Sequence, residues 1–180
     1  MMFVIARDRR AGSSSVHFLP EGGVVRMDEN TLLARMGNTV IVQTDRDKYT
    51  IEAPGSLNMT EKVLHFVPLE AMLQVKEDED VVENLHRLEE VAWSEEMPKE
   101  VRRFLRIYAA LYGLKILDRI PVSYKETVAL TVSRLAGEPV GKLISEREEV
   151  ERKLEADLEG IIREMNPAYL NQAINAVIAV

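Results

Sequence analysis

Residues 76–93, KEDEDVVENLHRLEEVAW, contain the change of pattern that decides the fold. Residues 76–80 are all charged and mostly acidic, and they separate two parts of the chain that differ in periodicity. The apolar residues that follow recur at helical spacing: Val81, Val82, Leu85, Leu88, Val91 and Ala92. This spacing predicts an amphipathic helix over residues 79–93. We therefore expect the acidic run to join an N-terminal domain, residues 1–75, to a C-terminal domain, residues 76–180.

On the N-terminal side, the apolar runs are short, rich in β-branched residues and separated by turn residues. Strands are predicted at residues 2–6, 16–19, 24–27, 39–44 and 49–53, with a sixth at 62–67. Turn or loop residues fill 8–15, 20–23, 45–48 and 54–56. Between the third and fourth strands, residues 28–36 predict a short helix that Asp28 caps and Gly37 closes. Together these elements predict a small β-rich barrel or sandwich.

On the C-terminal side, the periodicity is helical. Residues 99–119 are apolar on nearly every side from 104 to 117, which is typical of the buried central helix of a bundle. Asn166 and Pro167 separate a last helix, predicted at 168–180. A bundle of four to five helices follows from this pattern. Because strands and helices are segregated along the chain, the predicted fold class is α+β.

Two capping boxes predict where inner helices of the bundle begin. Ser123 precedes Glu126 by three positions, and Ser145 precedes Glu148 in the same way. In a capping box the serine and the glutamate each satisfy a backbone N–H of the first turn. The helix that begins at Ser123 is expected to end at Gly137, because glycine readily adopts the left-handed conformation of a helix C-terminus.

Composition and charge exclude several classes of protein. The chain has 180 residues, 46% of them apolar, a net charge of −7 and no cysteine, so disulfides, thiolate metal sites and cysteine nucleophiles are excluded. Residues 76–180 carry most of the acidity, with 15 Lys and Arg against 21 Asp and Glu, a poor match for nucleic acid phosphates. No stretch predicts a spanning helix or a signal peptide, so we expect a soluble cytoplasmic protein without membrane contact.

The sequence contains no motif of a common enzyme class. GxSxG, the Walker loop GxxxxGK[ST] and the dinucleotide fingerprint GxGxxG are all absent. Of the three histidines, His17 and His65 are expected to pack partly buried in strands. His86 has the helical spacing to share a metal with Glu83 or Glu90, but a solvated helix face is the preferred interpretation because no second histidine lies within a turn. We assign no catalytic residue, metal or cofactor, and favour a protein that is not an enzyme.

Residues 7–15, RDRRAGSSS, form the most unusual local segment. Three arginines adjoin a Gly-Ser run rich in hydroxyl and backbone N–H donors, a combination that can form an anion-binding concavity. The candidate anion- or nucleic-acid-binding residues are Arg7, Arg9, Arg10, Ser13, Ser14 and Arg46. A mobile, solvated hairpin loop explains the same composition, and the sequence leaves both interpretations open.

The last predicted helix has no charged side chain between residues 168 and 180 and must dock either within the chain or on another chain. Its candidate partner-binding residues are Leu170, Ile174, Val177 and Ile178. We accordingly expect a non-catalytic binding or assembly protein that uses its helical domain to contact a protein partner or a second copy of itself. The alternative is a protein that binds nucleic acid or a phosphate ligand through residues 7–15.

Overall fold

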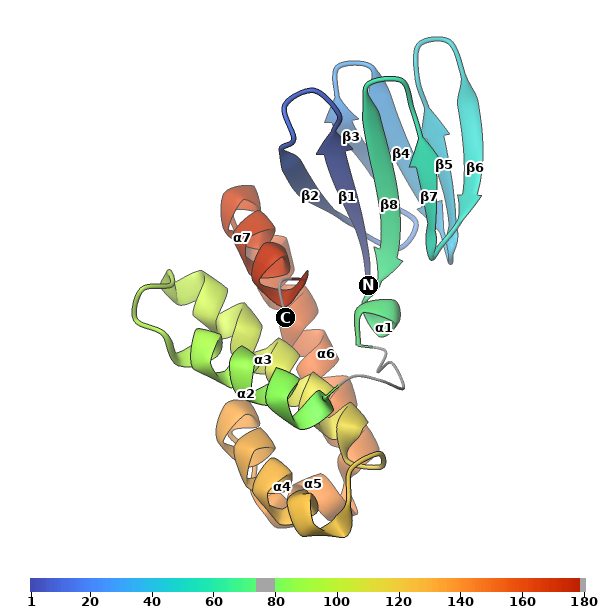
Figure 1. The fold of residues 1–180 in the computed structure, drawn as a ribbon. Helices are drawn as coiled ribbons and strands as arrows, with labels where there is room; N and C mark the ends of the chain where they lie inside the picture. The colour runs from blue at the N-terminus through green and yellow to red at the C-terminus, as the bar shows by residue number, and fades with distance from the viewer. Residues whose placement is uncertain (74–79, 179–180) are drawn as a thin grey trace. The chain divides into compact units, whose positions relative to one another are not determined.

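The computed structural model describes residues 1–73 and 80–178. The chain divides into two compact units, Met1–Gln74 and Val75–Val180. The described part of the first unit contains strands and one short helix, whereas that of the second is helical (Figure 1). The predicted α+β class, with a β-rich N-terminal part and a helical C-terminal part, is therefore confirmed. Most of the acidic run, residues 76–79, lies outside the described residues.

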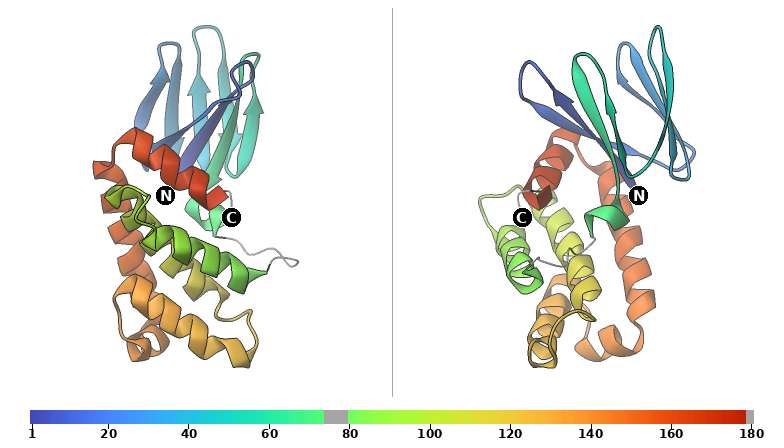
Figure 2. Two further views of the ribbon diagram at one scale, coloured as in Figure 1. Left: turned by 60° about the vertical axis from the view of Figure 1, so that its left-hand side comes forward. Right: turned by 45° about the vertical axis from the view of Figure 1, so that its right-hand side comes forward.

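The first unit consists of two four-stranded antiparallel sheets (Figures 1 and 2). The sheet with order β2-β1-β8-β7 contains β1 (Met2–Asp8), β2 (Ser14–Leu19), β7 (Gly55–Asn58) and β8 (Lys62–Pro68). The sheet with order β3-β4-β5-β6 contains β3 (Val24–Asp28), β4 (Thr31–Met36), β5 (Thr39–Gln43) and β6 (Lys48–Glu52). A short helix, α1 (Leu69–Met72), follows β8. The sheets do not close into a barrel, so of the two predicted forms the arrangement is the sandwich-like one.

Alternation along the strands builds the core between the two sheets. Side chains two positions apart share a face, so each strand contributes every second residue to one apolar layer. This layer is buried and contains Met2, Val4, Ala6, Leu19, Leu33, Val40, Val42, Ala53, Leu64 and Phe66. The strand pairs β1–β2, β3–β4, β5–β6 and β7–β8 all turn at the same end of the sandwich (Figure 1). We call this the loop end.

The predicted helix at residues 28–36 is wrong, because this segment forms the β3–β4 hairpin. Asp28 does use its side chain as a local acceptor, but it accepts the N–H of Asn30 at 2.9 Å within a turn. From Thr31 the burial alternates, with Leu33 fully buried and Met36 75% exposed. The sequence pattern also does not predict strand β7, because its first residues, Gly55 and Ser56, have turn chemistry. The sequence therefore undercounts the strands.

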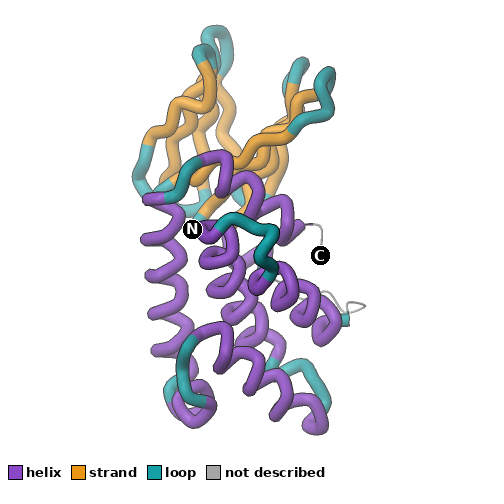
Figure 3. The backbone as a smooth tube through the Cα atoms, turned by 90° about the vertical axis from the view of Figure 1, so that its left-hand side faces the viewer, coloured by secondary structure: helices purple, strands orange, loops and turns teal. Residues whose placement is uncertain are grey.

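Six helices form the described part of the second unit. They are α2 (Val81–Trp93), α3 (Lys99–Ile116), α4 (Val122–Ala136), α5 (Val140–Ser145), α6 (Arg147–Glu164) and α7 (Pro167–Ile178). Short loops join successive helices, as the tube in Figure 3 shows. The predicted α2 helix is confirmed, with the Asp80 carboxylate accepting the N–H of Glu83 at 3.1 Å. The short helix α5 is an addition to the predicted set.

Both predicted capping boxes are wrong. Helix α4 begins after Pro121, so Ser123 already lies inside its first turn and caps nothing. Ser145 ends α5 and donates its hydroxyl to the Gly141 carbonyl at 2.9 Å. Helices α4 and α5 each start after a proline, which fixes φ and has no N–H to satisfy. The predicted stop at Gly137 is confirmed, since that residue is left-handed with φ of 69°.

Helix α3 is the centre of the helical unit, as predicted. It packs against α2, α4, α6 and α7, and eleven of its residues are buried. It approaches α4 closely at Gly113, where an added Cβ would lie 2.3 Å from Val132 Cγ2. Glycine therefore sets the spacing of these two helices. Gly160, in the exposed face of α6, has no heavy atom within 4 Å of the same position.

These two glycines give a matched prediction for stability. Gly113→Ala should lower the free energy of unfolding of the helical unit by about 1–3 kcal/mol, because the new methyl overlaps Val132. Gly160→Ala should raise it by about 0.5–1 kcal/mol through helix propensity alone. Chemical unfolding followed by circular dichroism at 222 nm measures both. Gly113→Ala combined with Val132→Ala should lose less than the two single changes together. Equal changes in the free energy of unfolding for Gly113→Ala and Gly160→Ala would contradict the close approach of α3 and α4.

Candidate functional site

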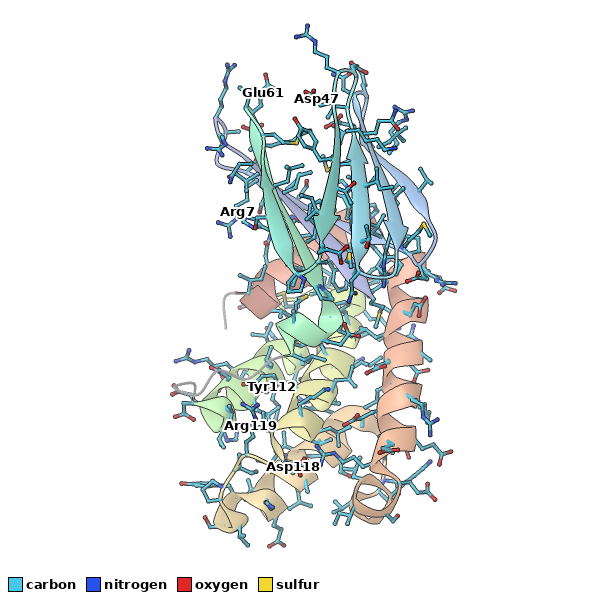
Figure 4. All side chains as sticks on the ribbon, turned by 90° about the vertical axis from the view of Figure 1, so that its right-hand side faces the viewer. Arg7, Asp47, Glu61, Tyr112, Asp118 and Arg119 are labelled. Carbon is cyan, nitrogen blue, oxygen red and sulfur yellow. The ribbon has the colours of Figure 1, made fainter. Side chains whose placement is uncertain are left out.

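A cavity of about 670 Å³ opens at the loop end of the sandwich. Three hairpins supply its lining: β3–β4, β5–β6 and β7–β8. We call it the loop cavity. Its lining residues are Asp28, Glu29, Asn30, Thr31, Thr44, Asp45, Arg46, Asp47, Tyr49, Asn58, Met59, Thr60, Glu61 and Lys62. Figure 4 shows Asp47 and Glu61 at this end, from hairpins of different sheets.

Local hydrogen bonds hold these hairpins in shape. The Thr44 hydroxyl accepts the N–H of Asp47 at 3.0 Å, while the Thr44 N–H donates to the Asp47 carbonyl at 2.8 Å. Across β7–β8, the Met59 N–H donates to the Lys62 carbonyl at 2.9 Å. Turn residues thus satisfy the backbone of the loops, as Asx- and Ser/Thr-type turns do. These bonds leave the carboxylates of Asp47 and Glu61 to face the cavity or solvent.

The charge of the loop cavity is mainly negative. Five lining residues are acidic, namely Asp28, Glu29, Asp45, Asp47 and Glu61, whereas two are basic, Arg46 and Lys62. Within residues 1–73 and 80–178, only Asp28 among the five carboxylates takes part in an ion pair. Like charges gathered around one opening repel each other, so the cavity favours positive groups over negative ones.

The ion pair between Asp28 and Lys62 connects the two sheets. Asp28 ends β3 and Lys62 begins β8, and both side chains are partly exposed, at 40% and 24%. Partial burial raises the pKa of the Asp28 carboxyl. This effect is outweighed by the bond from Lys62 and by the bonds from the Asn30 N–H and the Thr31 hydroxyl, so the pKa lies below its ordinary value. The pair lines both the loop cavity and a second, smaller one.

The smaller cavity, about 290 Å³, is lined by Ala6, Asp8, Ser13, Ser14, Ser15, His17, Met27, Asp28 and Lys62, and we call it the serine cavity. Within it the Ser15 hydroxyl and His17 Nε2 lie 3.1 Å apart. Burial lowers the pKa of His17 below its ordinary value. The Lys62 charge acts in the same direction and the Asp28 charge in the opposite one.

The six predicted anion-binding residues lie in different places, and one of them, Arg10, is exposed in the loop between β1 and β2. Ser13 and Ser14 line the serine cavity and Arg46 lines the loop cavity. The Arg9 guanidinium donates to Asn58 Oδ1 at 3.1 Å. Arg7 lies on the side of the sandwich, away from Asp47 and Glu61 (Figure 4). The predicted residues therefore do not line one common cavity.

The backbone donors of the 7–15 loop are partly occupied by the protein's own carboxylate. Asp8 Oδ1 accepts the N–H groups of Arg10 at 2.8 Å and Ala11 at 2.9 Å. These two bonds, that of Ala11 first, hold the pKa of Asp8 below its ordinary value. Asp8 thus takes the position that an external anion would need in order to use these donors.

The predicted partner-binding residues of α7 differ in exposure. Leu170 and Ile174 are 5% and 0% exposed, and α7 packs against α3. Val177 is half-buried, and Ile178 is 49% exposed. Only the end of the predicted contact set is therefore open to another molecule, and the rest belongs to the core.

The other two histidines have separate surroundings. His65 Nδ1 lies 2.8 Å from the Ser56 hydroxyl on the face of its sheet opposite the core, and His86 is exposed on α2. Across the described residues, no three or more His, Asp or Glu side chains are grouped so that they could hold a metal ion. In the same part of the chain, none of the helices combines the length and the apolar character that crossing a membrane requires.

The two residues that line both cavities, Asp28 and Lys62, are not among the predicted site residues. The sequence pattern predicts Asp28 as a helix cap and Lys62 only as the start of a strand. The predicted loop 8–15 hides the relation of Ser15 to His17, because residues two apart share a face only within a strand and β2 begins at Ser14. A signal for Asp28 with Lys62 is absent, because the two residues are 34 positions apart and meet only when the sheets pack.

Comparison with known proteins gives no relative: no protein family model, no curated protein and no solved structure matches the chain. The geometry of the cavities is therefore the basis for a proposed function.

The Asp28–Lys62 pair predicts how stability depends on pH. A folded-state pKa below the unfolded value contributes stability above the unfolded value, about 3.9 for Asp, and loses it as pH falls through the folded value. Acid unfolding between pH 5 and 2, followed by circular dichroism, should therefore be less steep in Asp28→Asn and in Lys62→Met than in the unchanged protein. If the three proteins lose structure with the same dependence on pH between 5 and 2, the lowered pKa of Asp28 does not contribute to stability.

Helix α7 predicts two different effects within one turn. Ile174→Ala should destabilise the helical unit by about 2–5 kcal/mol, because it leaves a cavity in the core. Ile178→Ala should change stability by less than about 0.5 kcal/mol, as an exposed substitution does. Urea unfolding compares the two. A large loss at Ile178 would show that the end of α7 is core as well.

Proposed function

We propose that this is a binding protein whose ligand-binding site is the loop cavity of the sandwich, and that its ligand is a basic peptide segment of a protein partner. The observation that carries the proposal is a cavity of about 670 Å³ that three hairpins build at one end of a two-sheet scaffold. Loops positioned by a rigid sheet framework are common binding sites, because their side chains vary while the framework holds their position. The volume is within the range of ligand pockets in proteins.

The charges of the loop cavity select the class of ligand. Asp45, Asp47 and Glu61 have no ion-pair partner in the part of the chain that the structure describes. A Lys or Arg side chain of a ligand would relieve their mutual repulsion and replace solvent with charge-assisted hydrogen bonds. Threonine, asparagine and tyrosine groups in the same lining can bond the ligand backbone. A phosphate ligand would instead meet a surface of its own sign.

Binding of a fluorescein-labelled hexa-arginine peptide, measured by fluorescence anisotropy, tests this proposal. The triple variant Asp45→Asn, Asp47→Asn, Glu61→Gln should raise the Kd about tenfold or more, since three exposed charge contacts of about 0.5 kcal/mol each sum to that factor. Affinity in the unchanged protein should fall as salt rises from about 50 to about 200 mM.

The control removes the same number of charges elsewhere in this acidic chain. Glu95, Glu96 and Glu100 are exposed in the helical unit, and their change to Gln should leave the Kd within about twofold. Equal weakening in both triple variants would mean that the peptide follows net charge only, and would overturn the proposal.

The predicted alternative, a nucleic acid or phosphate ligand at the 7–15 loop, stays a proposal with its own measurement. A labelled single-stranded RNA that binds the unchanged protein but not Arg9→Ala with Arg10→Ala would favour it. Contact of the helical domain with a protein partner or a second copy stays a proposal too, with Ile178 as its exposed residue. So does a cytoplasmic location, with which the absence of cysteine is compatible.

A further inference from the structure

On the core-facing side of strand β2, successive side chains extend in a row from the core of the sandwich to the serine cavity. The register of this strand with β1 pairs Leu19 with Met2, His17 with Val4 and Ser15 with Ala6, so all these residues share the face that packs on the second sheet. Leu19 is fully buried, His17 is half-buried and Ser15 is exposed. The row therefore changes from apolar to polar as it reaches the loop end.

The last two members of this row form a hydroxyl–imidazole pair. Ser15 Oγ and His17 Nε2 lie 3.1 Å apart, within the reach of a general base that accepts a serine proton. A serine hydroxyl is a weak nucleophile until such a base is beside it. Burial keeps the pKa of His17 low, so the imidazole is neutral at pH 7 and Nε2 can accept that proton.

We propose that Ser15 is a nucleophile, with His17 as its general base, toward carboxylic esters that carry a small, uncharged acyl group. The cavity of about 290 Å³ next to the pair limits the size of that group. Asp8 and Asp28 line the same cavity with a single cation, Lys62, which disfavours an anionic substrate. This activity goes beyond the proposed binding of a peptide and uses a different cavity.

The reaction proceeds in two balanced steps. Ser15 Oγ forms a bond to the carbonyl carbon while its proton passes to His17 Nε2, and the protonated imidazole then gives that proton to the leaving alcohol as the ester C–O bond breaks. Water attacks the acyl-Ser15 in the second step, with His17 taking one of its protons and returning it to Ser15 Oγ as the acid leaves. Lys62 is paired with Asp28, and the remaining N–H donors of its ammonium are the groups of the cavity lining that can stabilise the oxygen that becomes negative in each step.

Covalent labelling of the full chain with a fluorophosphonate–biotin probe, mapped by mass spectrometry of its peptides, tests the nucleophile. In this reaction the Oγ–P bond forms, the P–F bond breaks and fluoride leaves, while His17 takes the proton. We expect the label at Ser15, no label in Ser15→Ala, and a rate at least about 100-fold lower in His17→Gln, as removal of a general base produces. Label in Ser15→Ala, or an unchanged rate in His17→Gln, would overturn the proposal.

A second Ser–His pair provides the matched control. Ser56 Oγ and His65 Nδ1 lie 2.8 Å apart on the opposite face of the same sheet, and Ser56 is exposed. Ser56 should take no label, because it does not line the serine cavity. Labelling of Ser56 as fast as Ser15 would mean that hydrogen bonding to histidine suffices, and would also overturn the proposal.

A thiol in place of the hydroxyl keeps the test valid if an alanine variant fails to fold. Because the chain has no cysteine, Ser15→Cys introduces a single thiol of nearly the same size. Its alkylation by iodoacetamide at pH 7 should be at least about tenfold faster than that of Ser56→Cys or Ser14→Cys, and should slow when His17→Gln is added. Its rate should also fall as acid protonates His17, whose charged neighbours are Asp28 and Lys62. Equal rates at the three positions would count against Ser15.

Discussion

The ion pair between Asp28 and Lys62 is the interaction on which both cavities depend. It joins the end of one sheet to the start of a strand in the other, where the apolar layer of the sandwich stops. Because both groups are partly exposed, the pair contributes little net free energy of folding. Its importance lies in its position, because Asp28 and Lys62 line both the loop cavity and the serine cavity.

This position follows from the way the strands alternate. Phe66 and Leu64 face the core, and the next residue on that face of β8 is Lys62. On β2 the corresponding row passes from Leu19 to His17 and then Ser15. The same periodicity that builds the core therefore places chemically active groups at its open end, without any irregularity in these two strands.

The parts of the fold that local pattern specifies are predictable. Helix α2 follows from its apolar stripe, the central helix α3 from apolar residues on every side, and most strands from β-branched runs between turn residues. The prediction is wrong where the same residues fit two kinds of local structure, as at residues 28–36. Asp28 can cap a helix or close a turn, and Leu32 with Met36 fits either period. There, pairing with the neighbouring strands decides for a hairpin.

The candidate site is less predictable than the fold. The hairpins that build the loop cavity come from residues 28–31, 44–47 and 58–62, and a sequence shows each as an ordinary polar turn. Only the sheet order brings them to one opening. The arginine-rich loop stands out by its composition, but its own aspartate occupies two of the backbone donors that made it a candidate. Composition identifies donors, whereas only geometry shows whether they are free.

The two ends of the first unit meet at the side opposite the loop end. The Leu69 N–H donates to the Met1 carbonyl at 2.9 Å, so the chain enters and leaves the sandwich at neighbouring points. A unit built this way can be inserted into a surface loop of an unrelated protein, or circularly permuted, with little strain at the junction. The loop cavity and the serine cavity would then face outward from the host. Neighbouring ends at one side and hairpins at the other are the arrangement that grafting of new hairpin sequences onto a scaffold requires.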